Sequence, residues 1–378
     1  MPRPGRLVQT SEGYATFIPD PLPPTIDWTP RIVSALSDAD RAIGRLAGEG
    51  RRLPNPHVLM RPFVAREAVL SSRIEGTQAT LGELLAAEAG AIVDRSPDDL
   101  REVANYVVAL EYGAAALSEL GITVRLLQET HARLLRGVRG EEAQPGRVRD
   151  AQNWIGVPGS TPHTALYVPP PADALGELLA SLERFLGQTA LPPLVQIALA
   201  HYQFEAIHPF LDGNGRVGRL LITLFLLSRG VLPSPLLYLS AFFEATRAEY
   251  YGRLHAVSKE GDWENWILYF VNGVARQSED AVDRASRILE ILDGWRLRVA
   301  GLGSDTPARL VDLLAGNPFV TAAGVSERLG VARTTATRAI ARLVDLGILR
   351  QVGERRRDRA YCARAILDVL EEPAKLVP

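Results

Sequence analysis

The most constraining stretch of this chain is a polar string enclosed by two apolar segments. Residues 208–219 read HPFLDGNGRVGR, between the apolar PPLVQIALAHYQFEAI and GRVGRLLITLFLLSRG. Apolar flanks of this length are typical of buried helices. Gly213, Asn214 and Gly215 permit the positive-φ backbone that turns N–H groups inward as an anion-binding nest. We therefore expect two core helices, the second starting near Arg216, joined by a loop that can hold an anion.

The polar side chains of the string suit a polyphosphate and a proton transfer. Arg216 and Arg219 are three positions apart, share one helix face and can hold phosphate oxygens bidentately. The Asp212 carboxylate is a hard oxygen ligand for a Mg²⁺ that bridges phosphates. His208 titrates near neutrality and can take a proton from a hydroxyl. An ordinary capped helix N-terminus would explain any one of these residues, but not the whole string.

The string matches the Fic motif, HxFx(D/E)GNGRxxR, at every defined position. The LPNP, RPF and EAVLSSRIEGTQATL stretches and the proline-rich lead resemble the N-terminal region of one large bacterial Fic group, which often ends in a winged helix. The resemblance covers nearly the whole chain. It implies an all-α, mainly helical Fic core with a β-hairpin flap, followed by a C-terminal winged-helix domain.

The resemblance also implies an activity. Most Fic proteins with this motif transfer AMP from ATP to a Ser, Thr or Tyr hydroxyl of a protein and release pyrophosphate. By position, His208 is then the general base, Asp212 holds Mg²⁺ and Phe210 packs beneath the loop. The implied phosphate contacts are Gly213, Asn214 and Gly215 at the α- and β-phosphates, Arg216 at the β-phosphate and Arg219 at the γ-phosphate.

An irregular stretch precedes the motif. Residues 140–171 are rich in Gly and Pro, and WIGV and ALYV within them read as two short strands around PGSTPHT. The resemblance implies that this is the flap, within Ile155 to Val168, to which a target peptide adds as a strand. It also implies an adenine pocket on the helices after the motif, where we expect Tyr251 and Asn272.

Glu75 stands in an unusual place. A helical stretch, with Pro62 near its start, leads to Glu75 and stops at Gly76, although the helix macrodipole disfavours a negative charge in a last turn. A solvated surface glutamate is the plain alternative. Ser71 to Gly76 also fits the (S/T)xxxE(G/N) pattern of the Fic inhibitory helix. The resemblance implies that Glu75 pairs with Arg219 and misplaces the ATP phosphates; whether Glu75 also helps to remove AMP from a target stays open.

Helical patterns fill most of the remaining chain before residue 300. The proline-rich residues 1–30 are expected to be an extended arm, LPNPHVLMRP a break, and DDLREVANYVVALEYGAAAL a helix capped by Asp98 or Asp99. RIVSALSDADRAIGRLAG predicts a helix with one apolar stripe, formed by Ile32, Leu36, Ala39, Ile43 and Leu46.

Three regions are expected. They are an N-terminal helical region over 1–97 with the inhibitory helix around 63–76, a Fic catalytic domain over 98–300 and a winged helix over 307–370. The last region reads helix, helix, helix and two-stranded wing. Its local basic surplus suits DNA, and a protein-interaction or dimerisation surface is the alternative. The charges are Arg333, Arg338 and Arg342 in the third helix, and Arg350, Arg355, Arg356, Arg357 and Arg359 against Glu354 and Asp358 in the wing.

Composition sets the outer limits. The chain has 378 residues, a net charge of −2 and one cysteine, so the whole molecule is no electrostatic nucleic-acid binder and has no intrachain disulfide. Its start has no apolar signal core, and its longest strongly apolar run, residues 220–227, is far shorter than a membrane span. A cytoplasmic protein without a membrane partner is expected.

Alternatives remain for the function. Some Fic relatives move phosphocholine, a phosphate or UMP, and others remove AMP; Gly215 favours the ordinary nucleotide orientation, because the phosphate-transferring branch typically carries lysine there. A DNA-binding regulator whose Fic domain senses ATP, or modifies the protein itself, is an alternative of another class. The target protein is open, and a homodimer is the commonest oligomer.

Overall fold

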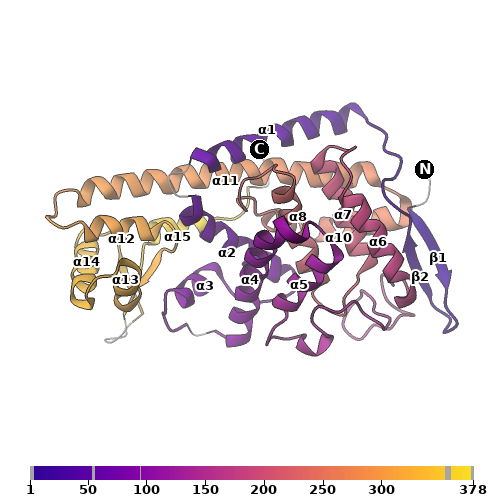
Figure 1. Ribbon diagram of the computed structural model, residues 1–378, viewed down its shortest axis with the longest axis horizontal. Coiled ribbons are helices and arrows are strands. Elements are labelled where there is room, and N and C mark those ends of the chain that lie inside the picture. The colour runs from indigo at the N-terminus through magenta and orange to yellow at the C-terminus, as the bar shows by residue number, and fades with distance from the viewer. Residues whose placement is uncertain (1–3, 53–55, 94, 354–358, 376–378) are drawn as a thin grey trace.

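The computed structural model of the protein describes residues 4–52, 56–93, 95–353 and 359–375. The chain is mainly helical, as predicted, and elongated, with the helices around the motif towards one end and the winged helix at the other (Figure 1). Between them runs α11 (Trp263–Val299), whose 37 residues make a helix of about 55 Å. None of the described helices combines the length and apolarity needed to cross a membrane.

The apolar stripe predicted for the first helix is confirmed. α1 (Pro30–Arg52) lies along α11, and the five stripe residues from Ile32 to Leu46 are all buried. This contact ties the N-terminal region to the helix that runs through the whole molecule.

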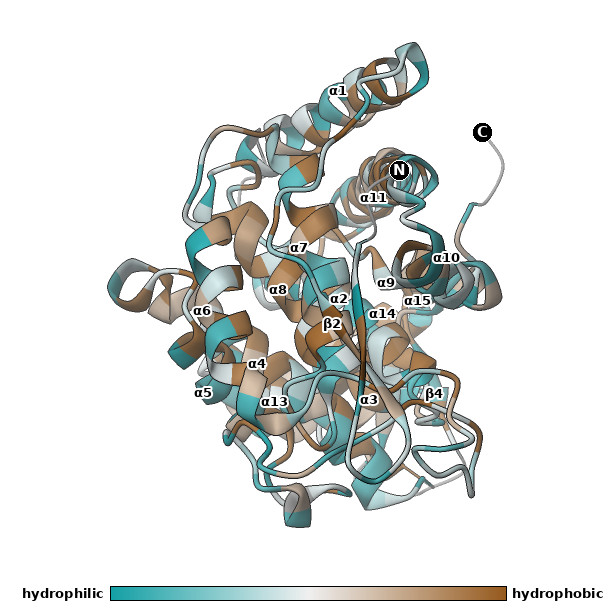
Figure 2. Ribbon diagram, turned by 90° about the vertical axis from the view of Figure 1, so that its right-hand side faces the viewer, coloured by the Kyte–Doolittle hydropathy of each residue, from teal (hydrophilic) through white to brown (hydrophobic). Residues whose placement is uncertain are grey.

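Two core helices carry the motif, as expected. α7 (Pro193–Ile207) and α8 (Asn214–Ser228) are buried along almost their whole length, and Figure 2 shows their apolar residues in the middle of the molecule. A helix that is apolar on all sides belongs in a core, so the ends of the motif loop are held firmly. The surrounding helices are α4 (Pro97–Leu120), α5 (Val124–Leu134), α6 (Leu175–Leu186), α9 (Ser240–Ala245) and α10 (Arg247–Glu260).

α2 (Pro56–Ile74) begins earlier than expected. The break predicted over LPNPHVLMRP is wrong from Pro56 onward, and Pro62 lies inside the helix. Proline suits a first helical position, and the burial of the next turn, which begins with Phe63, offsets the hydrogen bond that Pro62 cannot make. Gly76, with a φ of 100°, lies in the turn that ends this run before α3 (Leu81–Glu88).

The predicted cap of α4 is wrong. Ser96 is the capping residue, Pro97 takes the first helical position, and Asp98 and Asp99 both lie in the first turn. Carboxylates are favoured there by the helix macrodipole, so these residues serve the helix start without being its cap.

The N-terminal arm is only partly extended. β1 (Gly5–Gln9) and β2 (Ala15–Pro19) form an antiparallel hairpin that was not predicted, and the chain then runs extended to α1. Phe17 N–H of β2 donates to the carbonyl of Val168 at 2.9 Å, so the hairpin lies against the flap. The flap has less strand than predicted: its two segments pair through one antiparallel bridge, Ile155 with Tyr167. Prolines in and beside it cannot donate to a longer ladder.

The C-terminal region has the predicted winged-helix order. α12 (Thr306–Leu314), α13 (Ala322–Leu329) and α14 (Arg333–Asp345) precede a wing of β4 (Arg350–Val352) and β5 (Ala360–Cys362). Two elements were not predicted: β3 (Phe319–Thr321), which pairs with β5, and α15 (Arg364–Glu371), which packs on α2, α3 and α11. The wing residues Glu354, Arg355, Arg356, Arg357 and Asp358 lie outside the described residues. The three region boundaries stay predictions.

Candidate active site

The loop between α7 and α8 has an unusual backbone. His208 ends α7 in the left-handed region, with a φ of 49°, which is uncommon outside glycine, and Gly213 begins α8 with a φ of 77°. The Asn214 carboxamide closes the loop, because it accepts from Phe210 N–H at 2.8 Å and donates to the Phe210 carbonyl at 2.7 Å. Such strain persists only where surrounding contacts impose it, and it clusters at functional sites.

Two expectations about this loop are wrong. α8 begins at Asn214 rather than near Arg216, and in residues 213–215 only Gly213 has a positive φ. The side chain of Asn214 is engaged with Phe210, so any phosphate contact from this residue comes from its N–H. The first N–H groups of a helix lack intrahelical acceptors and favour an anion. The anion-binding character of the loop therefore comes from the start of α8.

A cavity of about 640 Å³ opens beside the loop. Its walls come from the flap, α7, α8, α10 and the turn after α2, and they include the predicted site residues Glu75, His208, Gly215, Arg219 and Tyr251. Residues from five separate parts of the chain thus meet at one cavity.

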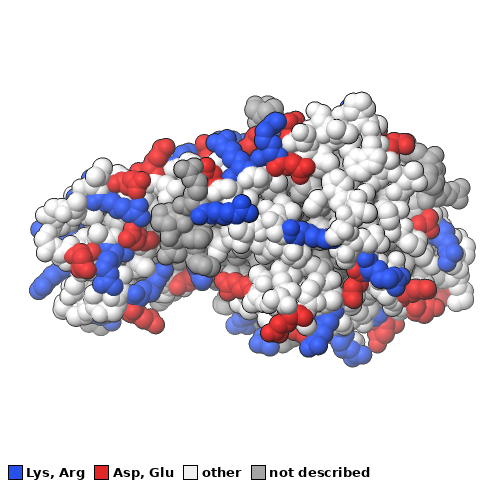
Figure 3. All heavy atoms as spheres, turned by 45° about the horizontal axis from the view of Figure 1, so that its top comes forward, with Lys and Arg blue, Asp and Glu red and all other residues white. Residues whose placement is uncertain are grey.

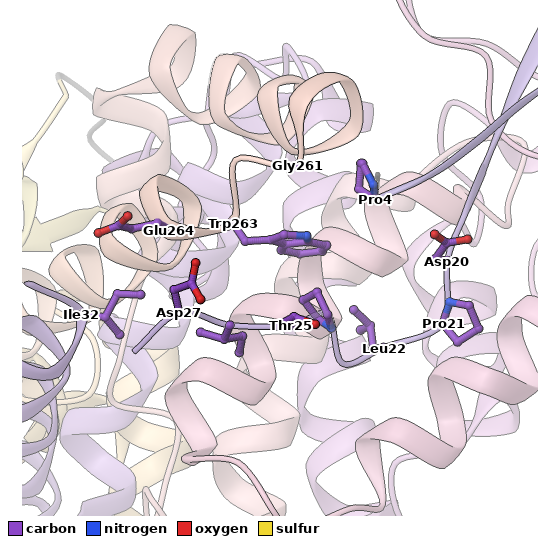
Figure 4. A pocket seen from close by; sticks show the side chains of 12 residues that line it. Pro4, Asp20, Pro21, Leu22, Thr25, Asp27, Ile32, Gly261, Trp263 and Glu264 are labelled. Carbon is purple, nitrogen blue, oxygen red and sulfur yellow. The ribbon is translucent and has the colours of Figure 1, made fainter. Parts of the chain in front are cut away.

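A second cavity, of about 390 Å³, lies between the N-terminal arm and the start of α11. Figure 4 shows Trp263 in its middle, with Asp27 and Glu264 on one side and Asp20 on the other. No residue of the motif lines it, so it is separate from the candidate active site.

The side chain of His208 is in the form that a general base needs. Its Nδ1 lies 3.3 Å from the carbonyl of Glu205, so Nδ1–H donates there and Nε2 keeps its lone pair. Burial lowers the pKa of His208 to about 4, below the near-neutral value expected from the sequence. The imidazole is therefore neutral at pH 7 and can accept a proton.

The two motif arginines share one face of α8, are both buried, and have different partners. Arg216 pairs with Glu102 of α4 and lies 3.6 Å from Asp212 Oδ1. Arg219 donates from Nε to Ser71 Oγ at 2.8 Å, and from Nη2 to the Ser71 carbonyl at 2.9 Å and to Glu75 Oε1 at 2.7 Å. Each buried cation thus has a carboxylate partner from another helix or its end.

Glu75 lies between Arg219 and the start of α8. Burial disfavours its charge, but the Arg219 guanidinium outweighs burial, and the pKa of Glu75 lies below its ordinary value. A Cβ at Gly215 would collide with Glu75 Oε1, so glycine at 215 provides space for this carboxylate. The contact expected between Glu75 and Arg219 is present, and Ser71 contributes both of its oxygens.

Two buried residues that the sequence analysis did not single out shape the loop. His131 of α5 accepts from Gly146 N–H at Nδ1, so its Nε2–H donates to the carbonyl of Asp212 at 3.0 Å, and its ring stacks on Phe210 at 3.9 Å. Arg149 donates to the carbonyl of His208 at 2.9 Å. One sequence signal could have identified His131: it is a polar residue on a helix face that is mostly apolar. Glu102, the partner of Arg216, carries the same signal on α4.

Family models match three parts of the chain. The Fic/DOC family N-terminal model matches residues 33–115, and the Fic/DOC family model matches residues 121–226. Together these two models take in half of the chain, including Glu75 and the loop before α8. The chain belongs to the Fic/DOC family. An IclR helix-turn-helix model matches residues 308–353, which agrees with the winged helix.

Curated relatives and solved structures show the same family. Protein adenylyltransferase fic-1 of Caenorhabditis briggsae is 31% identical over 219 residues, which are 56% of this chain and 39% of that protein. Protein adenylyltransferase Fic of Drosophila grimshawi is 32% identical over 216 residues, 56% of this chain and 40% of that protein. The chain thus spans about two-fifths of the length of these relatives.

Two Fic structures have a similar fold. A Fic family protein from Desulfovibrio desulfuricans G20 gives a TM-score of 0.61 at 23% identity, covering 90% of this chain and 98% of that chain. A fragment of Fic-1 from C. elegans gives 0.55 at 26% identity, covering 69% and 75%. The first likeness, at such low identity, shows the fold alone.

The structure does not bring every predicted site residue to the Fic cavity. Asn272, expected in the adenine pocket, is exposed on α11 and does not line the cavity. Its neighbours Val271 and Gly273 take the buried face of that helix. Tyr251 of α10 does line the cavity and is 39% exposed. Asp212, Gly213, Asn214 and Arg216 lie in the loop and first turn of α8, outside the cavity lining.

Glu205, which the sequence analysis also missed, is a titratable group inside the cavity. Its Oε1 is buried and has no hydrogen-bond partner among the described residues, and a Cβ at Gly218 would collide with it. Burial raises the pKa of Glu205 to about 8; the charge of Arg219 opposes this and that of Glu75 adds to it. A carboxyl group in this setting is largely neutral at pH 7.

We expect Glu205→Gln to remove a pH dependence of stability. Between pH 4.5 and 8 the folded state keeps a proton on Glu205 that the unfolded chain has lost, so wild-type stability falls as pH rises. The free energy of unfolding of Glu205→Gln minus that of wild type should increase by roughly 1.5 kcal/mol from pH 5.5 to pH 7.5. This is less than the full linkage value because the side chain is partly exposed. Urea unfolding at both pH values measures it. Glu177→Gln, at an exposed carboxylate of α6, is the control, and equal pH slopes for wild type and Glu205→Gln would contradict the prediction.

Proposed function

We propose that this Fic protein is a protein adenylyltransferase, which moves AMP from ATP to a Ser, Thr or Tyr hydroxyl of a target protein and releases pyrophosphate. The observation that carries the proposal is His208, a neutral imidazole with an open Nε2 in a cavity shared with Arg219. The names of the curated relatives support it.

In the proposed reaction His208 Nε2 takes the proton of the target hydroxyl. The hydroxyl oxygen forms a bond to the α-phosphorus of ATP, and the bond from that phosphorus to the oxygen bridging the α- and β-phosphates breaks, so pyrophosphate leaves with the electron pair. N–H groups of Asn214, Gly215 and Arg216 at the start of α8 receive the phosphate charge. Phosphoryl-type transfer depends mainly on such positioning and charge neutralisation.

The residues present fit a Mg²⁺ carried by the nucleotide. The Asp212 side chain is 45% exposed beside the start of α8, and its Oδ1 already accepts from Gly213 N–H at 2.6 Å. Mg²⁺ takes one or two carboxylates and completes its shell with phosphates and water, so one exposed carboxylate beside the phosphate site suits this ion. Asp212 would hold the ion, which would neutralise phosphate charge.

Glu75 is proposed to inhibit this reaction. Arg219 is the cation we assign to the γ-phosphate, and its Nη2 is already used by Glu75 and the Ser71 carbonyl. With Glu75 in place the phosphates of ATP sit wrongly for attack. Glu75 directing a water to remove AMP from a modified target is the alternative role.

The flap is proposed to hold the target peptide, and α10 is proposed to hold the adenine ring of ATP. Val157 and Leu166 of the flap are 76% and 66% exposed, which suits a peptide added alongside the Ile155–Tyr167 bridge. Tyr251 offers an aromatic surface for adenine next to Arg247.

Labelled nucleotides test the proposal directly. We expect the Glu75→Gly variant to transfer label from α-labelled ATP, and not from GTP, CTP or UTP, to itself and to a protein of the host lysate. Preferential transfer from UTP, or of a terminal phosphate or phosphocholine, would replace AMP transfer by another Fic activity. Removal of AMP from labelled protein without transfer would assign the reverse role.

DNA binding is the second candidate function, because the exposed face of α14 carries Arg338 and Arg342 in a helix-turn-helix match. Basic and acidic side chains are mixed on the face shown in Figure 3. The proposed nucleic-acid contact is that of the winged helix. Cytoplasmic localisation and a homodimer stay predictions.

We expect full-length protein to bind duplex DNA with an affinity that falls steeply with salt. Arg338→Ala should reduce the salt slope by about one, as expected for one lost phosphate contact. Fluorescence anisotropy measures it, with Arg125→Ala on α5 as the control arginine. Absent or salt-insensitive binding would favour a protein-interaction surface instead.

A further inference from the structure

The C-terminal unit, residues 306–375, contacts α2 at a buried arginine. Arg66 of α2 is 5% exposed and donates to the carbonyls of Leu370 and Glu372, the second at 2.8 Å. These carbonyls lie at the end of α15, where a cation is favoured by the helix macrodipole. Figure 1 shows α15 below α11 and next to α2. Arg66 therefore joins the helix that leads to Glu75 to the last helix of the chain.

The same unit also holds α3, on the other side of Glu75. Asn317 Nδ2 donates to the carbonyl of Leu85 at 2.8 Å, and Thr321 Oγ1 donates to the carbonyl of Ala89 at 3.1 Å. Gly82 N–H donates to Glu371 Oε1 at 3.1 Å. Both flanks of Glu75, α2 before it and α3 after it, are thus hydrogen-bonded to the C-terminal unit.

The unit is in turn anchored on α11. Arg284, fully buried and paired with Asp280, donates to the carbonyls of Val369 and Pro373, and Arg287 pairs with the Glu372 carboxylate. Loss of a partner from a buried charged group is costly. α15 therefore has a defined seat between α11 and α2.

Helix geometry connects this seat to the active site. Arg66 and Glu75 are nine positions apart, about 13 Å along a helix, and Ser71 between them accepts from Arg219. A helix transmits a displacement along its axis, so a shift of α2 at Arg66 would also move Glu75. Gly76 and residues 77–80 form the non-helical joint between the two held helices.

We infer that the C-terminal unit is a latch, which holds α2 and α3 where Glu75 stays on Arg219. The inference rests on the proposed adenylyltransferase function, whose regulation it describes. Loosening the seat of α15 and β3 frees Glu75 and releases AMP transfer.

The test uses Arg66→Gln, which removes the latch contact on α2, and Asn317→Asp, which replaces the donor to Leu85 while keeping the Oδ1 that accepts from Phe319 N–H. Each should raise AMP transfer roughly tenfold in the wild-type background, as for a lost hydrogen bond to a charged or buried group. In the Glu75→Gly background neither should raise it further. Arg41→Gln, at an exposed arginine of α1 whose partner Asp38 lies on the same helix, is the control and should change nothing.

Hydrogen exchange separates this inference from the proposed function. Amides of residues 75–77 donate to carbonyls of Ser72 and Arg73, and they should exchange faster in both latch variants whether or not the protein transfers AMP. If the latch variants exchange faster but Glu75→Gly transfers no AMP, the latch is supported and the proposed adenylyltransferase function is contradicted. Transfer by Glu75→Gly, with unchanged exchange and no gain in a latch variant that keeps its wild-type far-UV spectrum, would overturn the latch. A gain of equal size in the Glu75→Gly background would also overturn it.

Discussion

Glu75→Gly should raise AMP transfer roughly 100-fold over wild type, because about 2.7 kcal/mol of productive phosphate binding returns when Arg219 is released. The ion pair that blocks it has one buried partner and a 2.7 Å contact. Breaking such a pair leaves a buried cation that needs a new counter-charge, and the γ-phosphate of ATP can supply one. The measurement is the initial rate of label incorporation from α-labelled ATP, into the protein itself and into lysate proteins.

A neighbouring ion pair provides the matched control for this variant. Arg73, also on α2, lies 3.6 Å from Glu244 of α9, and both side chains are partly exposed. Glu244→Gln removes a carboxylate near the same helix end and should leave the rate unchanged. An unchanged rate in Glu75→Gly, or an equal gain in Glu244→Gln, would count against inhibition by Glu75.

His208→Ala should abolish transfer in the active Glu75→Gly background, with a loss on the order of 10³-fold or more, as expected for a general base. The residue combines an open Nε2, a pKa lowered to about 4 by burial and a position in the cavity lining. Its removal should leave ATP affinity nearly unchanged. Single-turnover labelling and calorimetric titration with ATP measure the two effects.

His255, a second histidine in the cavity lining, is the control for the base. His255→Ala should keep more than about a tenth of the Glu75→Gly rate, because no general-base step depends on it. Labelling that persists in the His208→Ala double variant would remove His208 from the base role.

Much of the fold was readable because it depends on local pattern. The stripe of α1, the two apolar flanks of the motif and the three helices of the winged helix each repeat with helical period, and all three are present. Several of the errors came where local pattern is weak. The β1–β2 hairpin is short and rich in turn formers, and α2 starts at a proline that reads equally well as a break.

The candidate site was predicted unevenly for a related reason. His208 and Arg219 lie in the cavity with Glu75 as expected, whereas Asn272 faces solvent on α11. The role of a residue within a matched motif can be carried over between proteins of one family. Whether a residue outside the motif reaches the site depends on the rotation of its helix. The partner of Arg216, Glu102, is 114 residues away, and no spacing rule reaches that far.

The sequence by itself determined the family, most of the helices and a positive φ at Gly213, because a motif and a helical period depend on neighbours within a few positions. Only the tertiary structure decided which carboxylate meets which buried arginine, that Glu205 Oε1 finds no hydrogen-bond partner among the described residues and that α15 contacts α2. Hydrogen bonds form only at about 3 Å. A periodic pattern shows which face of a helix is buried, and packing alone decides what lies within that distance of it.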